Sequence, residues 1–490
     1  MQFLWGVKTV CFVRKDTIMR QLSLLTDLYE FSMANGFQQE LPDTWGTFDV
    51  FFRKVPDHGS FVISAGLQQV VEALQQFTFT AADLTYFKSL DLWDDDFLDY
   101  LASFQMQCKL TAVPEGTPVF PREPFLTIEG PLAQAQLLET LILNIVNHQS
   151  LIATKARRMT YAANGRPIME FGARRAQGPD SAVYGTRAAI IGGALSTSNV
   201  LAAQQFDIPV AGTMAHSWIQ AFDDELTAFR TWAKHYPDNS ALLVDTYDVL
   251  TSGVPNAITV FQELRAQGHE PVGIRIDSGD VAALTTQARA MLDAAGFPNA
   301  KITISNALDE TIITSLLHQG APVDNFGIGE NLITSASAPV LSGVYKLAAV
   351  EQDGHCIPKI KISASRAKLT MPGKKQVYRL YRPGTNVAFA DLIALQNEPV
   401  TTLKELAVYD SNPINLKAQR PLTDFEARPL LKATDLSAND FPSLATIRKH
   451  SQAQLETLPA PTQRLVNPDE YPVYMTAALA ELQAQLAAVD

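Results

Sequence analysis

The sequence predicts an α/β fold built around a barrel, and three observations lead to this prediction. From residue 166 onwards, short apolar strands alternate with helical stretches, as in parallel βα units. Six or more such units follow one another along the chain. No G-x-G-x-x-G motif follows any strand, which counts against a dinucleotide-binding sheet. The repeated units therefore favour a barrel, closed or incomplete, over an open doubly wound sheet.

The strands of this barrel are expected where short apolar runs end in polar or small residues. They are I-M-E-F (168–171), P-V-A-G (209–212), A-L-L-V-D (241–245), V-G-I-R-I-D (272–277), K-I-T-I-S (301–305) and V-D-N-F-G-I-G (323–329). Helices are expected over 182–204, 217–236, 254–267, 281–295 and 310–319. Gly320 follows the last of these, as a helix C-terminus prefers.

Outside the barrel region the expected elements are less regular. A helix over 24–36, ended by Asn-Gly, precedes a strand over 45–52, and a second helix follows Gly66. A small open sheet or barrel is expected over 111–130, and a long helix over 132–155 in which His148 is hydrogen-bonded. The remaining expected elements are strands over 343–350, 357–363, 376–381 and 386–395 and a final helix from Tyr474.

Length, charge and cysteine content limit the class of protein. A chain of 490 residues suggests about two to four domains. The net charge of −12, without a basic stripe, argues against nucleic acid and anionic membranes as partners. The three cysteines are widely spaced and give neither a disulfide framework nor a metal motif, so a cytoplasmic, reducing environment is expected.

The first 18 residues look only superficially like a signal peptide. Lys8 interrupts the apolar run, charged residues follow it, and no small-residue cleavage site is present. The run is too short to span a membrane, and no later segment is apolar for long enough. We therefore expect residues 1–18 to be a non-native or disordered leader, with Met19 as the natural start.

Basic and hydroxyl side chains follow two of the expected strands. Arg174 and Arg175 follow the first strand, and Thr213 and His216 follow the second. Since ligands bind at the carboxyl ends of parallel strands, these four side chains can share one site. Two guanidinium groups, a hydroxyl and an imidazole suit a phosphorylated anion.

His216 has two interpretations at this stage. Ser217 and Gln220 have the spacing of a capping box, which would place His216 just ahead of a helix N-terminus, a favourable position for a phosphorylated imidazole. The alternative is a structural histidine that bonds to a backbone carbonyl.

Acidic residues beside glycine follow a later strand. Strand alternation puts Arg275 and Asp277 on one face, and Ser278 and Gly279 come next. Such acids suit ribose hydroxyls or a hydrated magnesium ion bound through one or two carboxylates. Asp280 is expected to cap the helix that begins at residue 281.

Three further loops carry weaker signals. Ser305 and Asn306 end one strand and Gly329 ends another, where backbone amides can approach a phosphate. Asp245 and Asp248 form a further pair of acids after a strand, which is either functional or part of a solvated loop.

With these residues in view, the chain resembles nicotinate phosphoribosyltransferase. The resemblance runs from about residue 22 to at least residue 346 and rests on motifs in family order. They are L-L-T-D-L-Y (24–29), E-F-G-A-R-R (170–175), G-T-M-A-H-S (212–217), R-I-D-S-G-D (275–280) and L-S-G-V-Y-K-L (341–347). Each motif alone is weak, but the ordered set is specific.

The family fold that this resemblance implies is an incomplete α/β barrel beside a second α/β domain formed from both N- and C-terminal segments. We therefore expect an N-terminal domain over 19–155, the barrel over 156–370, and a C-terminal segment over 371–490 that completes the first domain. A homodimer with a shared active site is also implied.

The implied reaction joins nicotinate to 5-phosphoribosyl 1-pyrophosphate and gives nicotinate mononucleotide and pyrophosphate. ATP hydrolysis is coupled to it through a phosphorylated histidine, which the motif places at His216, and Mg²⁺ is the expected cofactor, with Asp277 as candidate ligand. Tyr29 matches a tyrosine that stacks on the pyridine ring from the neighbouring subunit, opposite Phe171. Thr213 and Arg275 match nicotinate contacts, and Arg275 would meet the carboxylate.

The resemblance also implies the contacts of the phosphoribosyl substrate. Arg174 matches a pyrophosphate contact, and His216, Arg174 and Asp277 are the expected catalytic residues. The remaining expected contacts are Asp277, Ser278, Gly279, Ser305, Asn306, Gly329 and Glu330. Glu330 departs from the family, in which threonine or glycine is frequent, so its backbone amide rather than its carboxylate is expected to bind the 5-phosphate.

One position favours the acid over the amide substrate. Relatives that use nicotinamide have an aspartate two residues before V-A-G, where this chain has Ile208. A slip of one residue would reach Asp207 instead. Quinolinate phosphoribosyltransferase remains the near alternative. More distant ones are a sugar-phosphate aldolase or isomerase, with Lys301 or Lys346 as Schiff-base candidates, and a phosphate-ligand sensor.

Overall fold

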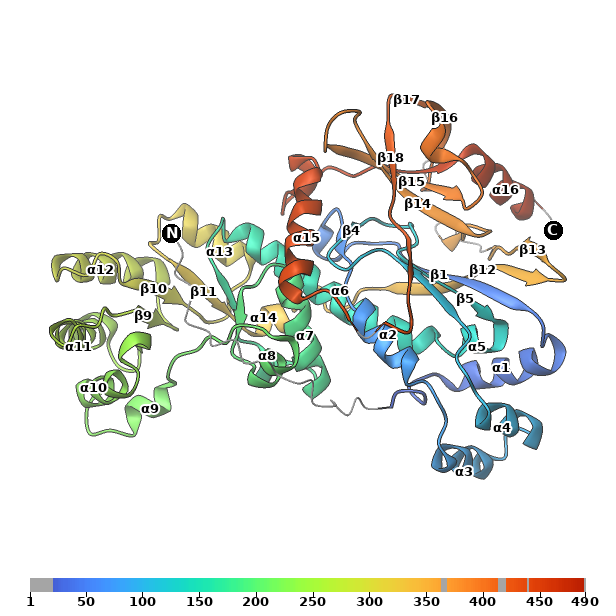
Figure 1. Ribbon diagram of the computed structural model, residues 1–490. Helices are drawn as coiled ribbons and strands as arrows, with labels where there is room; N and C mark the ends of the chain where they lie inside the picture. The colour runs from blue at the N-terminus through green and yellow to red at the C-terminus, as the bar shows by residue number, and fades with distance from the viewer. Residues whose placement is uncertain (1–20, 363–367, 413–419, 439, 489–490) are drawn as a thin grey trace.

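The architecture is that of an α/β protein, as the sequence predicts. It is known from a computed structural model that describes residues 21–362, 368–412, 420–438 and 440–488. The leader expected over residues 1–18 lies outside these residues. Figure 1 shows a lobe with a parallel sheet on the left and a larger lobe with two further six-stranded sheets on the right.

The parallel sheet forms the predicted incomplete barrel. Its strand order is β7-β6-β11-β10-β9-β8, and every neighbouring pair is parallel. β7 and β8 end this order without pairing to each other, so the barrel is open between them. The strands are β6 (Ile168–Glu170), β7 (Ser196–Thr197), β8 (Ala241–Leu243), β9 (Gly273–Ile276), β10 (Lys301–Ile304) and β11 (Asn325–Ile328).

Eight helices accompany these strands in the described residues. They are α7 (Pro179–Ile191), α8 (Val200–Phe206), α9 (His216–Gln220), α10 (Glu225–His235), α11 (Val254–Ala266), α12 (Val281–Ala294), α13 (Glu310–His318) and α14 (Glu330–Ile333). Asp280 caps α12 by accepting from the Ala283 N–H at 3.1 Å, as predicted.

Two of the expected barrel elements are wrong. The helix expected over 182–204 is broken into α7, β7 and α8, because Gly193 adopts a φ of +115° and Asn199 caps a new helix. The strand expected over 209–212 is a single bridge between Val210 and Thr197. Pro209 has no N–H to donate to a longer ladder.

The predicted capping box at Ser217 is also wrong. α9 begins at His216 itself, its N-cap is Ala215, and no side chain caps it. The helix expected to run to residue 236 is interrupted, and Asp224 caps α10 by accepting from the Thr227 N–H at 2.8 Å.

The second sheet is antiparallel and draws its strands from three parts of the chain. Its order is β13-β12-β1-β5-β3-β19. The strands are β1 (Trp45–Phe52), β3 (Lys109–Ala112), β5 (Leu126–Pro131), β12 (Gly343–Gln352), β13 (His355–Pro358) and β19 (Lys432–Thr434), and β2 (Val62–Ile63) pairs separately with β4 (Pro118–Val119). β1 has the bounds that the alternation predicts.

Six helices belong to the N-terminal part of the described chain. They are α1 (Leu28–Glu40), α2 (Leu67–Gln75), α3 (Ala81–Leu90), α4 (Asp95–Ala102), α5 (Leu132–Gln136) and α6 (Glu139–Ala162). α1 continues through the Asn-Gly pair that was expected to end it, and the expected helix over 132–155 is α5 and α6. His148 is not fully hydrogen-bonded, because its buried Nε2 has no partner among the described residues.

The third sheet is C-terminal, with the order β17-β16-β20-β15-β14-β18. Its strands are β14 (Lys375–Tyr381), β15 (Ala388–Leu395), β16 (Glu405–Asp410), β17 (Arg420–Thr423), β18 (Glu426–Pro429) and β20 (Val473–Thr476), with helices α15 (Leu444–Thr457) and α16 (Ala477–Ala487). Residues 474–476 are thus strand, where helix was expected. None of the helices in the described ranges has both the length and the apolar character needed to cross a bilayer.

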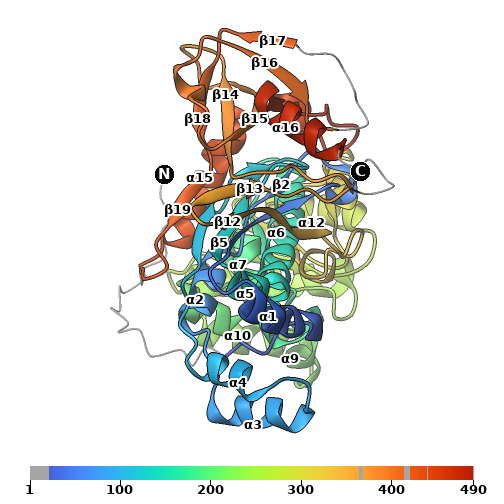
Figure 2. The same cartoon turned by 90° about the vertical axis from the view of Figure 1, so that its right-hand side faces the viewer.

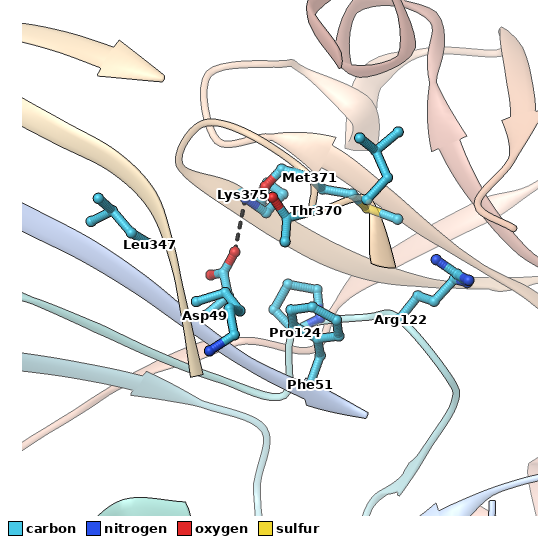
Figure 3. A pocket seen from close by; sticks show the side chains of 10 residues that line it. Asp49, Phe51, Arg122, Pro124, Leu347, Thr370, Met371 and Lys375 are labelled. Atoms are coloured by element: carbon cyan, nitrogen blue, oxygen red, sulfur yellow. Dashed lines mark hydrogen bonds and ion pairs between the residues drawn. The ribbon is translucent and has the colours of Figure 1, made fainter. Parts of the chain in front are cut away.

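A buried ion pair joins the second and third sheets. Lys375 of β14 lies 2.8 Å from the carboxylate of Asp49 on β1, and both side chains are buried (Figure 3). The adjoining hollow has a volume of about 10 Å³, which suits one water molecule at most. This junction is structural and holds no substrate-sized cavity.

The division into domains stays a prediction. β19, from the C-terminal segment, pairs with β3, which agrees with a second domain formed from both ends of the chain. β12 and β13 also lie in this sheet, although their residues fall within the range expected for the barrel. Figure 2 shows these strands stacked in front of the barrel helices.

The pH dependence of stability should depend on Glu123. This side chain is buried, and its burial and the nearby Asp391 raise its pKa well above the ordinary value, although Arg379 acts in the opposite direction. The folded state therefore holds the proton more tightly than the unfolded state. The resulting stabilisation is complete below the unfolded pKa and is lost as pH rises through the folded pKa.

We expect the free energy of unfolding of the wild type to fall, relative to Glu123→Gln, as pH rises from acid to mildly alkaline. Urea unfolding at a series of pH values measures this difference. The exposed Glu426→Gln is the control and should follow the wild type. Parallel curves for the wild type and Glu123→Gln would contradict the prediction.

Candidate active site

The carboxyl ends of the barrel strands bring most of the predicted residues together at one rim. Parallel strands end at the same edge, so the loops after β6, β8, β9, β10 and β11 are neighbours. Hydrogen bonds, ion pairs and ring contacts link side chains from these loops, and from the segment after β7. The rim is therefore one connected site.

Arg275 lies at the centre of this site. It projects from β9, and its guanidinium donates to Ser305 Oγ at 2.8 Å, to Thr213 Oγ1 at 3.2 Å and to Asp277 Oδ1 at 2.9 Å. The guanidinium carbon is 5.8 Å from the centre of the Phe171 ring. A flat ring with a carboxylate could lie against Phe171 and pair with this arginine.

Asp277 is held as a carboxylate. Burial alone would raise its pKa, but the hydrogen bond from Ser305 and the charges of Arg275 and His216 outweigh burial and keep the pKa below the ordinary value. Its side chain is 28% exposed, so it can still meet a ligand. An anionic carboxylate at the rim can accept from ribose hydroxyls.

Asp245 supports this loop from behind. It is buried at the end of β8 and accepts from the Asp277 N–H at 3.0 Å and from Ser278 Oγ at 2.6 Å. Its Oδ1 is buried without a hydrogen-bond partner among the described residues. Gly279 follows with a φ of +82°, which favours glycine. The choice left open for Asp245 is thus resolved against a solvated loop.

His216 faces Asp277 across the rim. Its Nδ1 lies 3.0 Å from Thr246 Oγ1, and its Nε2 lies 3.9 Å from Asp277 Oδ2. The imidazole side chain is 39% exposed. Its partners are side chains, so the structural alternative, a bond to a backbone carbonyl, is not observed. Thr246 fixes the ring while leaving the other nitrogen towards the rim.

The loops after β6 and β11 pack against each other closely. A Cβ on Gly327 would lie 2.6 Å from the Phe171 ring, and one on Gly172 would lie 2.8 Å from the Gly329 carbonyl. Only glycine allows this approach. The Phe171 loop and the expected phosphate loop therefore form one surface.

Charged side chains on this surface are exposed. Arg174 is exposed in the 3-10 turn η2 (Ala173–Arg175). Arg175 pairs with Glu330 at 3.3 Å, so the Glu330 carboxylate has a cationic partner of its own. Asn306 accepts from the Ala307 N–H and adopts a φ of +112°, a conformation in the left-handed region.

Tyr29 does not join the rim. It lies on α1, which Figure 1 places at the far side of the larger lobe from α9 and β9. It is 46% exposed, together with the neighbouring Leu25, Leu28 and Met33. Burial and the nearby Glu139 carboxylate raise its pKa, so the phenol is neutral.

The position before V-A-G that favours nicotinate over nicotinamide holds no acidic side chain. Ile208 is buried in the core. Asp207 is exposed and ends α8 in a left-handed conformation. Neither residue therefore offers a buried carboxylate that would accept from an amide.

The Schiff-base candidates for an aldolase are both elsewhere. Lys301 begins β10, at the opposite end from the rim, and pairs with Asp324 at 2.9 Å. Lys346 lies in β12 of the second sheet and pairs with Glu139 at 3.3 Å. Neither of the two candidates therefore lies at the rim, where aldol chemistry of this kind would require a lysine.

Two rim residues were missing from the expected site. Asp245 was singled out only as a possible loop acid, and Thr246 was not singled out at all. The signal available was their position at strand ends. Their roles depend on hydrogen bonds to other loops, which sequence order does not reveal.

Comparison with known proteins agrees with this geometry. Models of the nicotinate phosphoribosyltransferase (NAPRTase) family match residues 167–380, those of its N-terminal domain residues 24–147, and those of its C-terminal domain residues 374–483. The chain is 41% identical to nicotinate phosphoribosyltransferase of Bacillus subtilis, over 92% of both chains. The crystal structure of human nicotinic acid phosphoribosyltransferase superposes with a TM-score of 0.82 at 30% identity, covering 95% of this chain and all of that one.

Proposed function

The chain belongs to the nicotinate phosphoribosyltransferase family, and from this premise we propose that the Arg275 rim is where its reaction takes place. The protein is a nicotinate phosphoribosyltransferase, which forms nicotinate mononucleotide and pyrophosphate from nicotinate and phosphoribosyl pyrophosphate in NAD salvage. The observation that carries the location is the guanidinium of Arg275, joined to Thr213, Ser305 and Asp277 beside the Phe171 ring.

The reaction needs positioning more than proton transfer. The bond from the ribose anomeric carbon to pyrophosphate breaks and leaves an oxocarbenium-like centre, as in glycosyl transfer. The pyridine nitrogen supplies the electron pair for the new bond, so no general base is needed. Holding ring and sugar in line, and stabilising the departing diphosphate with Arg174 and His216, are the main tasks.

Arg275 accounts for the choice of an acid substrate. Its partners Thr213 and Ser305 are neutral, and Asp277 can turn to the ribose when the nicotinate carboxylate pairs with the guanidinium. The absence of a buried acid at Ile208 agrees with this preference. Assaying nicotinate against nicotinamide with phosphoribosyl pyrophosphate, with and without ATP, tests the function directly, and a preference for nicotinamide would refute it.

His216 is the proposed site of phosphorylation by ATP. The ring is exposed to the rim, and Thr246 holds Nδ1 while Nε2 faces Asp277. A phosphoryl group on this ring would change the charge beside the Asp277 loop. We propose that this change couples ATP hydrolysis to tighter binding of phosphoribosyl pyrophosphate.

The rim also suits Mg²⁺ brought with the diphosphate. The described residues contain no group of three or more histidine, cysteine or acidic side chains that could hold a metal. Mg²⁺ commonly uses one or two carboxylates and substrate phosphates instead. Asp277, with the unpartnered Oδ1 of Asp245 behind it, fits that need. The ion would neutralise the diphosphate charge when bound.

A homodimer with shared active sites is proposed from the position of Tyr29. This tyrosine lies on an exposed apolar face of α1, away from the rim of its own chain. The face consists of Leu28, Tyr29 and Met33 of α1 and of Leu25, which precedes the helix. A second copy of the chain packed on this face would bury the face and receive Tyr29 opposite its own Phe171.

The free thiols Cys108 and Cys356 agree with a reducing cytoplasm.

Mixing two inactive variants should restore activity if the site is shared. Tyr29→Ala and His216→Ala each damage every site in a pure dimer. A mixed dimer has one site that carries both substitutions and one site that carries neither. When equal amounts of the two variants are refolded together, about half of the dimers are mixed, so roughly a quarter of wild-type activity should be recovered. Recovery is measured as nicotinate mononucleotide formed. No recovery, with mixed dimers present, would show that Tyr29 serves its own chain.

A further inference from the structure

Glu170 is a buried carboxylate that directly precedes the Phe171 loop. It ends β6 and is 0% exposed. The buried carboxylates Glu115 and Glu310 pair with Arg187 and Lys155. In the described chain, by contrast, no cation is within ion-pair distance of Glu170, so neutral donors alone satisfy its charge.

Those donors come from three different segments. The Gly172 N–H donates to Oε1, whereas Thr186 Oγ1 of α7 lies 2.9 Å and Thr197 Oγ1 of β7 lies 2.7 Å from Oε2. Burial raises the pKa of Glu170, while the bonds from Thr197, Gly172 and Thr186 lower it. A buried acid costs free energy unless its oxygens are bonded in this way.

Two of these donors, Gly172 and Thr197, lead to different parts of the rim. Gly172 lies between Phe171 and Arg174 and packs on the Gly329 carbonyl. Thr197 exchanges backbone hydrogen bonds with the next segment, accepting from the Ala211 N–H at 2.9 Å and donating to the Pro209 carbonyl at 3.1 Å. That segment continues to Thr213.

We propose that Glu170 is a positioning residue, which fixes the Phe171–Arg174 loop relative to the Thr197–Thr213 segment beside the open side of the barrel. The inference rests on the proposed location of the reaction. β7 is an end strand of the sheet, so the rim there lacks the support that a closed barrel would give. The carboxylate of Glu170 supplies this support, because one side chain accepts hydrogen bonds from both loops.

A carboxylate suits this task better than an amide. Both of its oxygens accept, so one amide and two hydroxyls can donate to it at the same time. In Glu170→Gln the side-chain NH₂ cannot accept, and one loop loses its anchor. The loop that holds phosphate and pyrophosphate should then shift, whereas Arg275 on β9 keeps its partners Ser305 and Asp277.

The test compares matched variants in the full-length protein. Glu170→Gln is compared with Glu123→Gln, a second buried acid that lies outside the rim. Thr197→Val, which removes the donor at nearly constant volume, is compared with Thr197→Ser, which keeps it. The readouts are kcat, the KM of each substrate, circular dichroism and thermal unfolding.

We expect Glu170→Gln and Thr197→Val to fold and to lower kcat/KM for phosphoribosyl pyrophosphate about 10- to 100-fold, because small misplacements of a binding loop have such effects. The KM of nicotinate should change less. Glu123→Gln and Thr197→Ser should match the wild type in kcat and in the KM of each substrate. The double variant Glu170→Gln/Thr197→Val should lose no more kcat/KM than the more damaged of the two single variants, since both substitutions remove the same interaction.

Folded Glu170→Gln with wild-type kinetics would overturn the proposal, and so would equal kinetics for Thr197→Val and Thr197→Ser. If Glu170→Gln does not fold, the comparison of Thr197→Val with Thr197→Ser tests the proposal by itself. Wild-type protein inactive on nicotinate and phosphoribosyl pyrophosphate would instead refute the proposed function, and that result is distinct from either of these.

Discussion

Replacing Arg275 by alanine is expected to lower kcat/KM for nicotinate by an amount equivalent to about 2–5 kcal/mol, or roughly 30- to several-thousand-fold. The reason is the loss of the cation proposed to pair with the substrate carboxylate. Asp277 and Ser305, which now bond to the guanidinium, would also be left with fewer partners. Steady-state kinetics over a wide range of nicotinate concentration measures the loss.

Arg265→Ala is the matched control for this prediction. Arg265 forms an exposed pair with Glu270 at 2.8 Å, away from the rim, and such pairs contribute little. This variant should therefore behave like the wild type. Arg275→Lys should rescue only part of the activity, since an ammonium group cannot donate to three neighbours in the same fixed plane. An unaltered response of Arg275→Ala to nicotinate would rule out the pairing.

Replacing His216 by alanine is expected to abolish the stimulation by ATP and to lower kcat on the order of 100-fold. The variant lacks both the proposed acceptor of the phosphoryl group and the imidazole proposed to lie next to the departing diphosphate. Thr246 and Asp277 would lose a neighbour but no buried partner, so the fold should persist. Product formation with and without ATP measures the effect.

His235→Ala provides the control for the histidine prediction. His235 lies in the last turn of α10 and is absent from the rim contacts described above. It should retain ATP stimulation. Incorporation of labelled phosphate from ATP should likewise be present in His235→Ala and lost in His216→Ala. Full ATP-stimulated activity in His216→Ala would remove the phosphohistidine from the mechanism.

Local pattern was sufficient for much of the fold. The alternation of W-G-T-F-D-V-F-F predicted β1 with its observed bounds, and apolar runs between polar loops predicted β6, β8, β9, β10 and β11. Local pattern failed where contact with a neighbouring segment determined the secondary structure. β7 is a two-residue strand inside an expected helix, and it exists because β6 offers it a partner.

The rim shows the same division among its residues. Arg275, Asp277 and His216 could be proposed from strand ends and from the motifs that contain them. Asp245, Thr246 and Glu170 could not be assigned roles, because each acts through a hydrogen bond to a loop distant in sequence. The pairing of Glu330 with Arg175 was likewise unforeseen.

By itself the sequence determined the α/β class, the repeated βα units, the family and the residue types at the strand ends. Those properties are local or are carried by ordered motifs, and they depend on the chain's own periodicity. Only the tertiary structure decided which strands are neighbours in the sheet, which carboxylates face inwards, and that Tyr29 lies away from the rim of its own chain. These outcomes follow from packing between segments far apart in sequence, which no local pattern encodes.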